Sequence, residues 1–404
     1  MRVALVDVNF GASSTGKIVA DLVAGLSGRG HEACAFFGRG GGEAAGNARR
    51  ISTQAEVALH VLATRLSGFT DGFSPFATRR LIRELERLRP DVVHLHDIHG
   101  YFVDIPDLCA YLKRRGTPTV WTFHCEFMYT GRCGYAMDCE GWRSGCVACP
   151  DLSRYPKTWF FDFAGRMFRE KQAIFEDFRR LHLVAPSAWL ASRMRDSMVG
   201  GKTIDVVPNG LNTRIFKPSD AQSLKAGLGV ADKCCVLTVG ADLMSERKGG
   251  RWVIDLAQRF VGEDVVFIMV GVDDMPSAIP ENVRMLPRVD SQERLAELYS
   301  AGDVLMLPSA KETFSMVSAE ALACGVPVIG FDSGAPLEVA PEGYGSFVPY
   351  GDLDAVELLV RAARQGRAGL KSADECVTFA QSRYSLEAMV MAYESIYQRT
   401  IEST

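Results

Sequence analysis

Residues 304–329 read VLMLPSAKETFSMVSAEALACGVPVI, and the organisation of the chain is clearest here. The first four residues are apolar and stop at Pro308, as in a buried strand. A helix is predicted from about Phe314 or Ser315 to Cys324, and a second apolar run follows at 326–329. A strand, a helix and another strand in this order form the repeating unit of a parallel sheet that is covered by helices.

The same alternation runs along most of the chain. Buried strands are predicted at 3–8, 92–95, 119–123, 181–185, 236–239, 265–270, 283–286, 304–307 and 326–329. Turn residues gather between 200 and 220, where the first series of strands gives way to the second. The sequence therefore predicts an α/β protein of two Rossmann-like, doubly wound parallel-sheet domains that face each other across a cleft.

The expected domain limits follow from this division. The first domain is predicted at 1–205, with a cysteine-rich insertion at 125–150, and the second at 206–383. The remaining residues, 384–404, are predicted to form a helix that crosses back to the first domain.

Composition limits the classes of function. The 404 residues are 47% hydrophobic and 23% charged, with 45 basic and 49 acidic residues, so the net charge is −4. Nucleic acid is therefore not an expected partner. No apolar run is long enough to span a membrane, and the first residues resemble a buried strand rather than an export signal. We expect a cytoplasmic protein.

Two carboxylates lie at the predicted sheet edge. Glu312 is on the loop after the strand, and Glu320 is about two turns into the helix. The helix N-terminus favours a phosphate, and carboxylates accept hydrogen bonds from sugar or ribose hydroxyls. The alternative is an acidic first turn with a solvated glutamate.

Several motifs together resemble one family. Glu312 and Glu320 form an E-x7-E pattern, and further matches occur at 121–124 (WTFH), 207–218 (VPNGLNTRIFKP), 239–249 (VGADLMSERKG) and 384–397. In this order they resemble the retaining glycosyltransferases of family 4, which have the two-domain GT-B fold. The matches cover nearly the whole chain.

The resemblance implies roles for residues of the second domain. Glu312 would contact the donor sugar, Glu320 the nucleotide ribose, and Lys248 the diphosphate leaving group. The backbone N–H groups of Phe314, Ser315 and Met316 would face the sugar and the diphosphate. The family's arginine after the strand glycine is absent, because Ala241 follows Gly240. Arg247 either replaces it or is a solvated loop charge. The donor base is expected against the backbone near Arg288. Backbone contacts do not show in the sequence which base is bound, so the identity of the base is open.

Residues of the first domain are also implied. The loop with Gly11, Thr15 and Gly16 would line the donor phosphates and the acceptor, and His124 would contact the donor sugar near its reacting carbon. Strand alternation puts His94 and His96 on one face, which would permit a metal. We favour an acceptor-side role for these two and for His99, with no catalytic metal. Asp352 and Asp354 resemble a metal-binding D-x-D, but helix capping is the preferred interpretation.

Four of the eleven cysteines fall in one short segment. Their spacing is Cys133-x5-Cys139-x6-Cys146-x2-Cys149, and the last pair suits a tetrahedral structural zinc. Cys125 is a further candidate participant. Reduced thiols or an oxidised pair are the alternatives. The segment resembles a subgroup of family 4 that includes colanic-acid and other exopolysaccharide glycosyltransferases, which implies lipid-linked glycan acceptors.

The segment 157–180 carries aromatic and basic residues. A helix there could lie on an anionic bilayer at the inner face of the plasma membrane and meet a polyprenyl carrier, but a core-packing helix is favoured. The function that the resemblance implies is retaining transfer of a hexose from a nucleotide-diphosphate sugar, UDP- or GDP-linked, to a glycan or polyprenyl-linked acceptor in cell-surface polysaccharide synthesis. The alternatives are a GT-B-type sugar-nucleotide epimerase and a non-catalytic sugar-nucleotide-binding protein.

Overall fold

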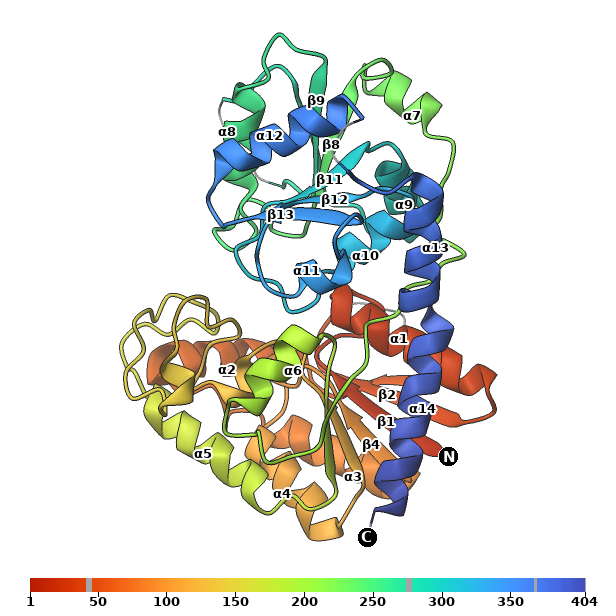
Figure 1. Ribbon diagram of the computed structural model, residues 1–404. Coiled ribbons are helices and arrows are strands. Elements are labelled where there is room, and N and C mark those ends of the chain that lie inside the picture. Colours follow the sequence, from red (N-terminus) through yellow and green to blue (C-terminus); the bar gives the residue numbers. More distant parts are fainter. Residues whose placement is uncertain (41–45, 274–277, 367–368, 404) are drawn as a thin grey trace. The chain divides into compact units, whose positions relative to one another are not determined.

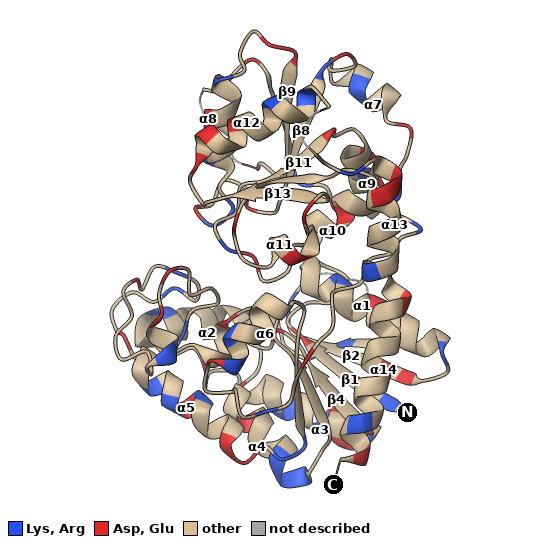
Figure 2. Cartoon of the chain, viewed as in Figure 1, with Lys and Arg blue, Asp and Glu red and all other residues tan. Residues whose placement is uncertain are grey.

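The computed structural model describes residues 1–40, 46–273, 278–366 and 369–403. The chain divides into two compact units: Met1–Asn209 with Leu386–Thr404, and Gly210–Ser385. The domain limits expected from the sequence lie a few residues earlier, at 205/206 and 383/384. Figure 1 shows helices around a sheet in each unit, and residues of both charge signs are spread over both units (Figure 2).

Unit 1 is built on a parallel sheet of seven strands in the order β3-β2-β1-β4-β5-β6-β7. The strands are β1 (Arg2–Asp7), β2 (Glu32–Phe37), β3 (Ala48–Arg50), β4 (Val92–Leu95), β5 (Thr119–Thr122), β6 (Leu181–Ala185) and β7 (Ile204–Val206). The helices are α1 (Ser13–Gly28), α2 (Gln54–Ser67), α3 (Pro75–Leu88), α4 (Ile105–Arg115), α5 (Ala164–Glu176), α6 (Ala188–Arg195) and α14 (Leu386–Glu402). Two 3-10 turns, η1 (Phe127–Tyr129) and η2 (Gly141–Arg143), lie in the insertion.

The C-terminal helix α14 belongs to unit 1, where it packs on α1 and on β4, β5 and β6 (Figure 1). Val390 fits against Gly25 of α1, where an added Cβ would come within 2.5 Å of the valine methyl. Glu394 pairs with Arg29 at 2.8 Å, and the rings of Tyr393 and Tyr397 are buried. The last residues of the chain therefore complete the core that the first residues begin.

Unit 2 has a parallel sheet of six strands in the order β10-β9-β8-β11-β12-β13. The strands are β8 (Cys234–Val239), β9 (Val265–Val270), β10 (Val283–Leu286), β11 (Val304–Leu307), β12 (Val328–Phe331) and β13 (Gly345–Val348). The helices are α7 (Gln222–Gly227), α8 (Gly250–Gln258), α9 (Gln292–Ser300), α10 (Met316–Ala323), α11 (Pro336–Val339), α12 (Leu353–Arg364) and α13 (Ala373–Tyr384). The prediction of two doubly wound parallel-sheet domains is confirmed.

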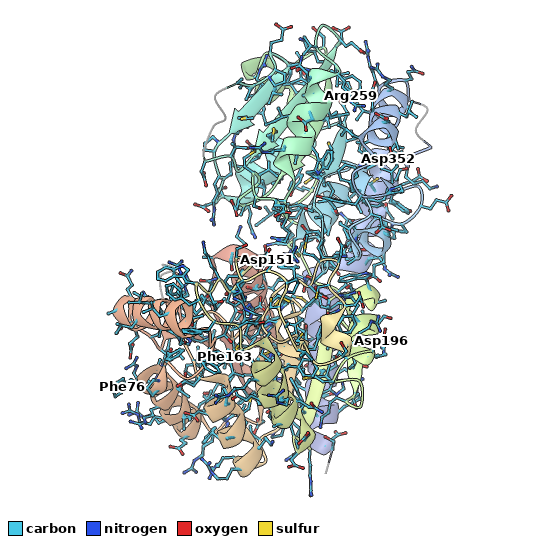
Figure 3. All side chains as sticks on the ribbon, turned by 90° about the vertical axis from the view of Figure 1, so that its left-hand side faces the viewer. Phe76, Asp151, Phe163, Asp196, Arg259 and Asp352 are labelled. Carbon is cyan, nitrogen blue, oxygen red and sulfur yellow. The ribbon has the colours of Figure 1, made fainter. Side chains whose placement is uncertain are left out.

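Two local predictions can be compared with these elements. Asp352, labelled in Figure 3, caps α12: its Oδ1 accepts the N–H of Ala355 at 3.0 Å, which confirms the capping interpretation. The predicted aromatic helix is shorter than expected, because α5 begins only at Ala164. Its apolar side chains, among them Met167 and Phe175, are buried, so the core-packing interpretation of this helix is confirmed.

Candidate active site

Two loops of unit 2 meet at the carboxyl end of its sheet. One follows β8 and carries Arg247 and Lys248; the other follows β11 and carries Glu312. Gly249 lets them approach, since its φ is +71° and a Cβ there would lie 2.4 Å from the carbonyl oxygen of Pro308. The N–H of Ala310 also donates to the Arg247 carbonyl at 2.8 Å. The backbone thus places both cations beside Glu312.

Glu312 is buried and faces two cations. Lys248 Nζ lies 2.7 Å from Oε1 of Glu312, and Arg247 Nη1 lies 3.6 Å from the same oxygen. Burial alone would raise the pKa of Glu312, but Lys248 and Arg247 outweigh it, and the pKa lies below its ordinary value. Ser309, which the sequence reading missed, adds a hydrogen bond to this carboxylate. Arg247 is therefore directed at the same group as Lys248.

The motif residues after Glu312 form the start of α10. Ser315 has the left-handed φ of +88°, and its hydroxyl lies 2.7 Å from that of Ser318. The N–H of Ser318 donates to the Ser315 carbonyl at 3.2 Å. The N–H groups before it stand at a helix N-terminus, a position that suits an anion. The Phe314 side chain is buried against Tyr384, with ring centroids 5.7 Å apart. Because its side chain is buried, Phe314 would face a donor sugar or diphosphate through its backbone N–H alone.

Glu320, Gly240 and Arg288 have separate surroundings. Glu320 accepts a hydrogen bond at 2.8 Å from the hydroxyl of Tyr299, a buried residue of α9 that the sequence reading missed. Gly240 directly follows β8 and begins the loop with the two cations. Arg288, two residues after β10, is half-exposed and pairs with Asp290 at 3.0 Å.

The glycine loop of unit 1 connects β1 to α1. The N–H of Gly11, whose φ is +67°, donates to the Gly16 carbonyl at 2.9 Å. The hydroxyl of Thr15 lies 3.4 Å from Oδ2 of Asp7, the last residue of β1. Burial raises the pKa of Asp7 to about 7. Asp7 was not predicted as a site residue, although an acid at the end of a buried strand is a usable signal.

The histidines after β4 and β5 separate into different environments. His124 Nε2 lies 3.0 Å from His96 Nδ1, and burial lowers the pKa of His124 to about 4, so its ring is neutral. His94 and His96 do lie on one face, with ring centroids 3.9 Å apart. His94, however, bonds Tyr397 of α14 at 2.7 Å and Thr122 at 2.8 Å. It is a core residue, which corrects the expected acceptor-side role.

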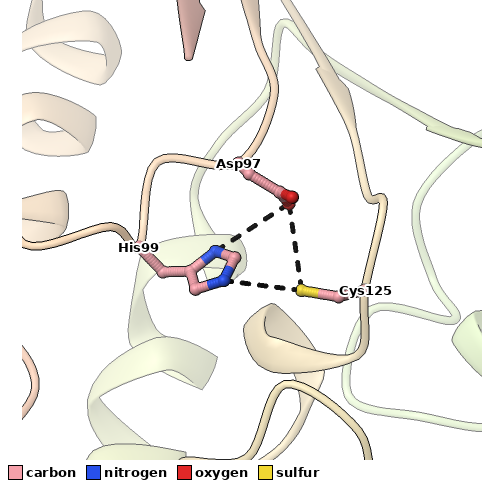
Figure 4. A group of neighbouring side chains, drawn as sticks. All are labelled: Asp97, His99 and Cys125. Carbon is pink, nitrogen blue, oxygen red and sulfur yellow. Dashed lines mark hydrogen bonds and ion pairs between the residues drawn. The ribbon is translucent and has the colours of Figure 1, made fainter. Parts of the chain in front are cut away.

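His99 joins Asp97 and Cys125 in a compact group (Figure 4). Cys125 Sγ lies 3.7 Å from His99 Nε2 and 3.8 Å from Asp97 Oδ1. His99 Nδ1 lies 3.8 Å from the same Asp97 oxygen. Asp97 was not predicted as a site residue, and Cys125 was considered only as a fifth participant in the cysteine cluster. Their signal in the sequence is a polar residue shortly after each of two adjacent strands.

The four cysteines of the insertion line one small cavity of about 30 Å³, together with Arg132. Each of the chain's eleven cysteines lies within the described residues and carries a free thiol, so the oxidised pair is not formed here. The N–H of Gly131 points at Cys146 Sγ at 3.1 Å, and that of Gly141 at Cys139 Sγ at 3.4 Å.

A buried ion pair holds the start of the insertion. Glu126 is fully buried and accepts hydrogen bonds from Arg193 Nε at 2.7 Å and from the Tyr129 hydroxyl at 2.8 Å. Its other oxygen accepts the N–H of Ala136 at 2.6 Å. This glutamate, which the sequence reading did not single out, links the insertion to α6.

Comparison with known proteins identifies the class that this fold and these loops define. A model described as "Glycosyltransferase Family 4" matches residues 15–215, and one described as "Glycosyl transferases group 1" matches residues 233–364. The chain belongs to the family 4 glycosyltransferases and is an enzyme of that class. Among the described residues, no helix is both long and apolar enough to cross a membrane.

Individual relatives agree with this family. The chain is 26% identical to the "Putative colanic acid biosynthesis glycosyl transferase WcaC" of Escherichia coli K12, over 86% of this chain and 85% of the relative. Sucrose-phosphate synthase from Thermosynechococcus elongatus superposes with a TM-score of 0.75 at 18% identity, over the full length of both chains. HepE from Anabaena, solved in complex with UDP-glucose, gives 0.66 at 14% identity, over 99% and 100% of the chains. These solved structures share the GT-B fold.

Proposed function

We propose that the chain transfers a hexose from a nucleotide-diphosphate sugar to a glycan or polyprenyl-linked acceptor, with retention at the anomeric carbon, in cell-surface polysaccharide synthesis. The observation that carries this proposal is the convergence of Lys248 and Arg247 on Glu312 beside the start of α10. The relation to WcaC supports a role in polysaccharide synthesis, and the UDP-glucose complex of HepE supports a UDP-sugar donor. A GDP-sugar is the second donor to be tested.

The charges suit departure of a diphosphate. When the bond between the sugar C1 and the β-phosphate oxygen breaks, its electron pair stays on the diphosphate. Lys248 and Arg247, which lie side by side at Glu312, would stabilise this growing charge. Glu312, ionised because its pKa is low, would then accept hydrogen bonds from the sugar hydroxyls.

The new bond forms between the acceptor oxygen and C1, on the face that the diphosphate leaves. The acceptor proton passes to the departing phosphate, so no protein base is required. Glu320 would hold the ribose, and the N–H groups at the start of α10 would bind the diphosphate. Gly11, Thr15, Gly16 and His124 of unit 1 would contact donor and acceptor atoms once both substrates are bound.

A thermal-shift screen with UDP-, GDP-, ADP- and dTDP-sugars tests donor binding. One nucleotide class should raise the melting temperature of the native chain. Glu312→Gln should reduce that rise, whereas Glu281→Gln, at an exposed position away from these loops, should preserve it. If no nucleotide sugar stabilises the native chain, the proposed donor chemistry is wrong. Epimer formation from the donor alone would favour the epimerase alternative.

We also propose that an exposed aromatic patch, Trp159, Phe160 and Phe161, contacts an anionic membrane. These three consecutive side chains are 45%, 66% and 53% exposed. They adjoin α2, whose Arg65 carbonyl accepts the Trp159 N–H at 2.9 Å and whose Leu59, Leu62 and Leu66 are exposed. Phe163, labelled in Figure 3, stacks on Phe69 at 4.4 Å and fixes the segment. The membrane contact thus involves the residues before α5 rather than the helix itself.

Arg65, whose guanidinium lies 5.8 Å from the centre of the Trp159 ring, and Lys157, two residues before Trp159, suit anionic headgroups, and the aromatic rings suit the interface. Sedimentation with vesicles of phosphatidylcholine and phosphatidylglycerol should capture the native chain. The double variant Trp159→Ser/Phe160→Ser should stay in the supernatant. Phe76→Ser, which removes an exposed phenylalanine on α3, should behave as the native chain does. Equal sedimentation of all three would remove the membrane proposal.

We propose, thirdly, that Cys133, Cys139, Cys146 and Cys149 hold a structural zinc. Their common cavity and the two N–H groups directed at sulfur support this, because such bonds stabilise thiolates. Four thiolates leave no open position, so this ion would stabilise the insertion and take no part in transfer.

A further inference from the structure

The group of Asp97, His99 and Cys125 is set by the sheet. β4 and β5 are adjacent parallel strands, so the residues that follow them emerge at the same edge. Asp97 and His99 come shortly after β4, and Cys125 comes shortly after β5. A carboxylate, an imidazole and a thiol from the segments after two different strands therefore meet at one edge of the sheet (Figure 4).

The spacing of these atoms suits one metal ion. One ligand atom from each residue can be chosen so that all three lie within 4.8 Å of one another. Zinc bonds of about 2.0–2.3 Å place neighbouring donors about 3.5 Å apart in a tetrahedron. The distances of 3.7 Å and 3.8 Å from Cys125 Sγ to His99 Nε2 and Asp97 Oδ1 need only a small contraction to reach this value.

The same distances argue against a nucleophile relay. In a cysteine–histidine–carboxylate relay the imidazole separates the thiol from the acid. Here the Asp97 oxygen is as close to the sulfur as to His99 Nδ1, 3.8 Å in both cases. A separation of 3.8 Å is also too long for an N–H···O hydrogen bond, so Asp97 does not orient the ring in that way.

The surroundings of the three residues hold the ligand side chains in place. The His99 ring stacks on Phe127 with centroids 4.6 Å apart, and Cys125 is buried. Asp7, a buried carboxyl, accepts the backbone N–H of Asp97 at 3.0 Å. The nearby ammonium of Lys171 is engaged by the carbonyls of Phe127 and Thr130, at 2.6 Å and 3.2 Å. The stacking and these hydrogen bonds thus hold the imidazole and the Asp97 backbone in place for an ion.

We infer that Asp97, His99 and Cys125 form a binding site for a divalent ion of the zinc class. It is distinct from the four-cysteine cluster and goes beyond the proposed transfer reaction. Three protein ligands leave the fourth tetrahedral position for a water molecule or a ligand oxygen. Cys125 would bind as a thiolate, its proton passing to solvent, and together with the Asp97 carboxylate it would neutralise a divalent ion.

Cobalt titration of the reduced, metal-free chain tests this site. Co²⁺ bound to a thiolate absorbs in the near ultraviolet, and metal retained after gel filtration gives the stoichiometry. Cys125→Ala and His99→Ala should each retain about one equivalent of Co²⁺ per chain less than the native protein. Cys34→Ala, which alters a half-buried cysteine on β2, should retain the native amount.

The count separates the two metal sites. If the four-cysteine cluster also binds metal, the loss is from two equivalents to one; if it does not, from one to none. Circular dichroism verifies the fold of each variant, and His99→Ala serves if Cys125→Ala does not fold. Equal cobalt content and equal absorption in the native chain and in a folded variant would overturn the inference.

Discussion

At the scale of single residues, Lys248 and Arg247 lie at different distances from Glu312, and this difference can be tested. Both cations face the same oxygen, but Lys248 is at 2.7 Å and Arg247 at 3.6 Å. The chain lacks the arginine that the family pattern has after Gly240. We therefore propose that the guanidinium of Arg247 is the second positive charge that contacts the donor diphosphate.

Removal of each cation should slow transfer to a different degree. Lys248→Met should lower kcat by about 100-fold or more, the usual effect of losing one preorganised electrostatic group. Arg247→Met should have a smaller effect, because its contact is longer. Initial rates over a range of donor concentrations provide kcat and KM for both variants. Equal, small losses in both would contradict the assigned role of Lys248.

The pH dependence of stability tests the Glu312 ion pair. In the folded protein the pKa of Glu312 is below its ordinary value of 4.5. Its ion pair with Lys248 and Arg247 therefore stabilises the fold at pH values above about 4.5. As pH falls through the folded pKa, the contribution is lost. Glu312→Gln should therefore lower the free energy of unfolding by about 1.5–3 kcal/mol at neutral pH. The difference should shrink below pH 4.5, as urea denaturation at several pH values would show. A constant difference would contradict it.

The helices and strands show which parts of the fold can be predicted from the sequence and which cannot. The central strands were predicted because each is a continuous apolar run, such as 304–307 or 265–270. β2, β3, β7 and β13 were missed because they are short or contain small and charged residues, as in Glu32–Phe37. Glu312 and Lys248 stand out in local motifs, whereas Asp97 and Cys125 meet only through strand pairing.

The approach of the two loops in unit 2 depends on Gly249. Gly249→Ala should displace the loop after β8, because the new methyl would lie 2.4 Å from the Pro308 oxygen at a φ of +71°. The melting temperature and the donor-induced shift should both fall. Gly227→Ala is the matched control, since an added Cβ there meets nothing within 4 Å. Equal behaviour of the two variants would contradict this packing account.

The insertion should depend on Glu126. Glu126→Ala leaves Arg193 without its buried carboxylate, and we expect a loss of about 3–5 kcal/mol. Glu140→Ala removes a half-exposed partner of the same arginine and should cost about 0.5 kcal/mol or less. Urea denaturation compares the two. A small effect of Glu126→Ala would mean that the insertion is held by other contacts.

For the whole molecule, the first and last parts of the chain form one unit. Tyr397 of α14 is buried in unit 1 and bonds His94 of β4 at 2.7 Å. Tyr397→Ala should therefore destabilise unit 1 by about 3–5 kcal/mol, as for other large core side chains. Met391→Ala, on the exposed side of the same helix, is the control. Hydrogen exchange should show lost protection in β4–β6 only for Tyr397→Ala.

The stereochemistry of the product tests the proposed reaction. The chain is incubated with the nucleotide sugar that stabilises it and with a lipid extract that supplies polyprenyl-linked acceptors. The configuration of the newly formed linkage is then read from the anomeric proton by NMR. Retaining transfer predicts an α-linked product from an α-configured donor. This product should be absent when the Lys248→Met variant is used. A β-linked product would contradict retention, and undiminished product with Lys248→Met would contradict the role of the cations beside Glu312.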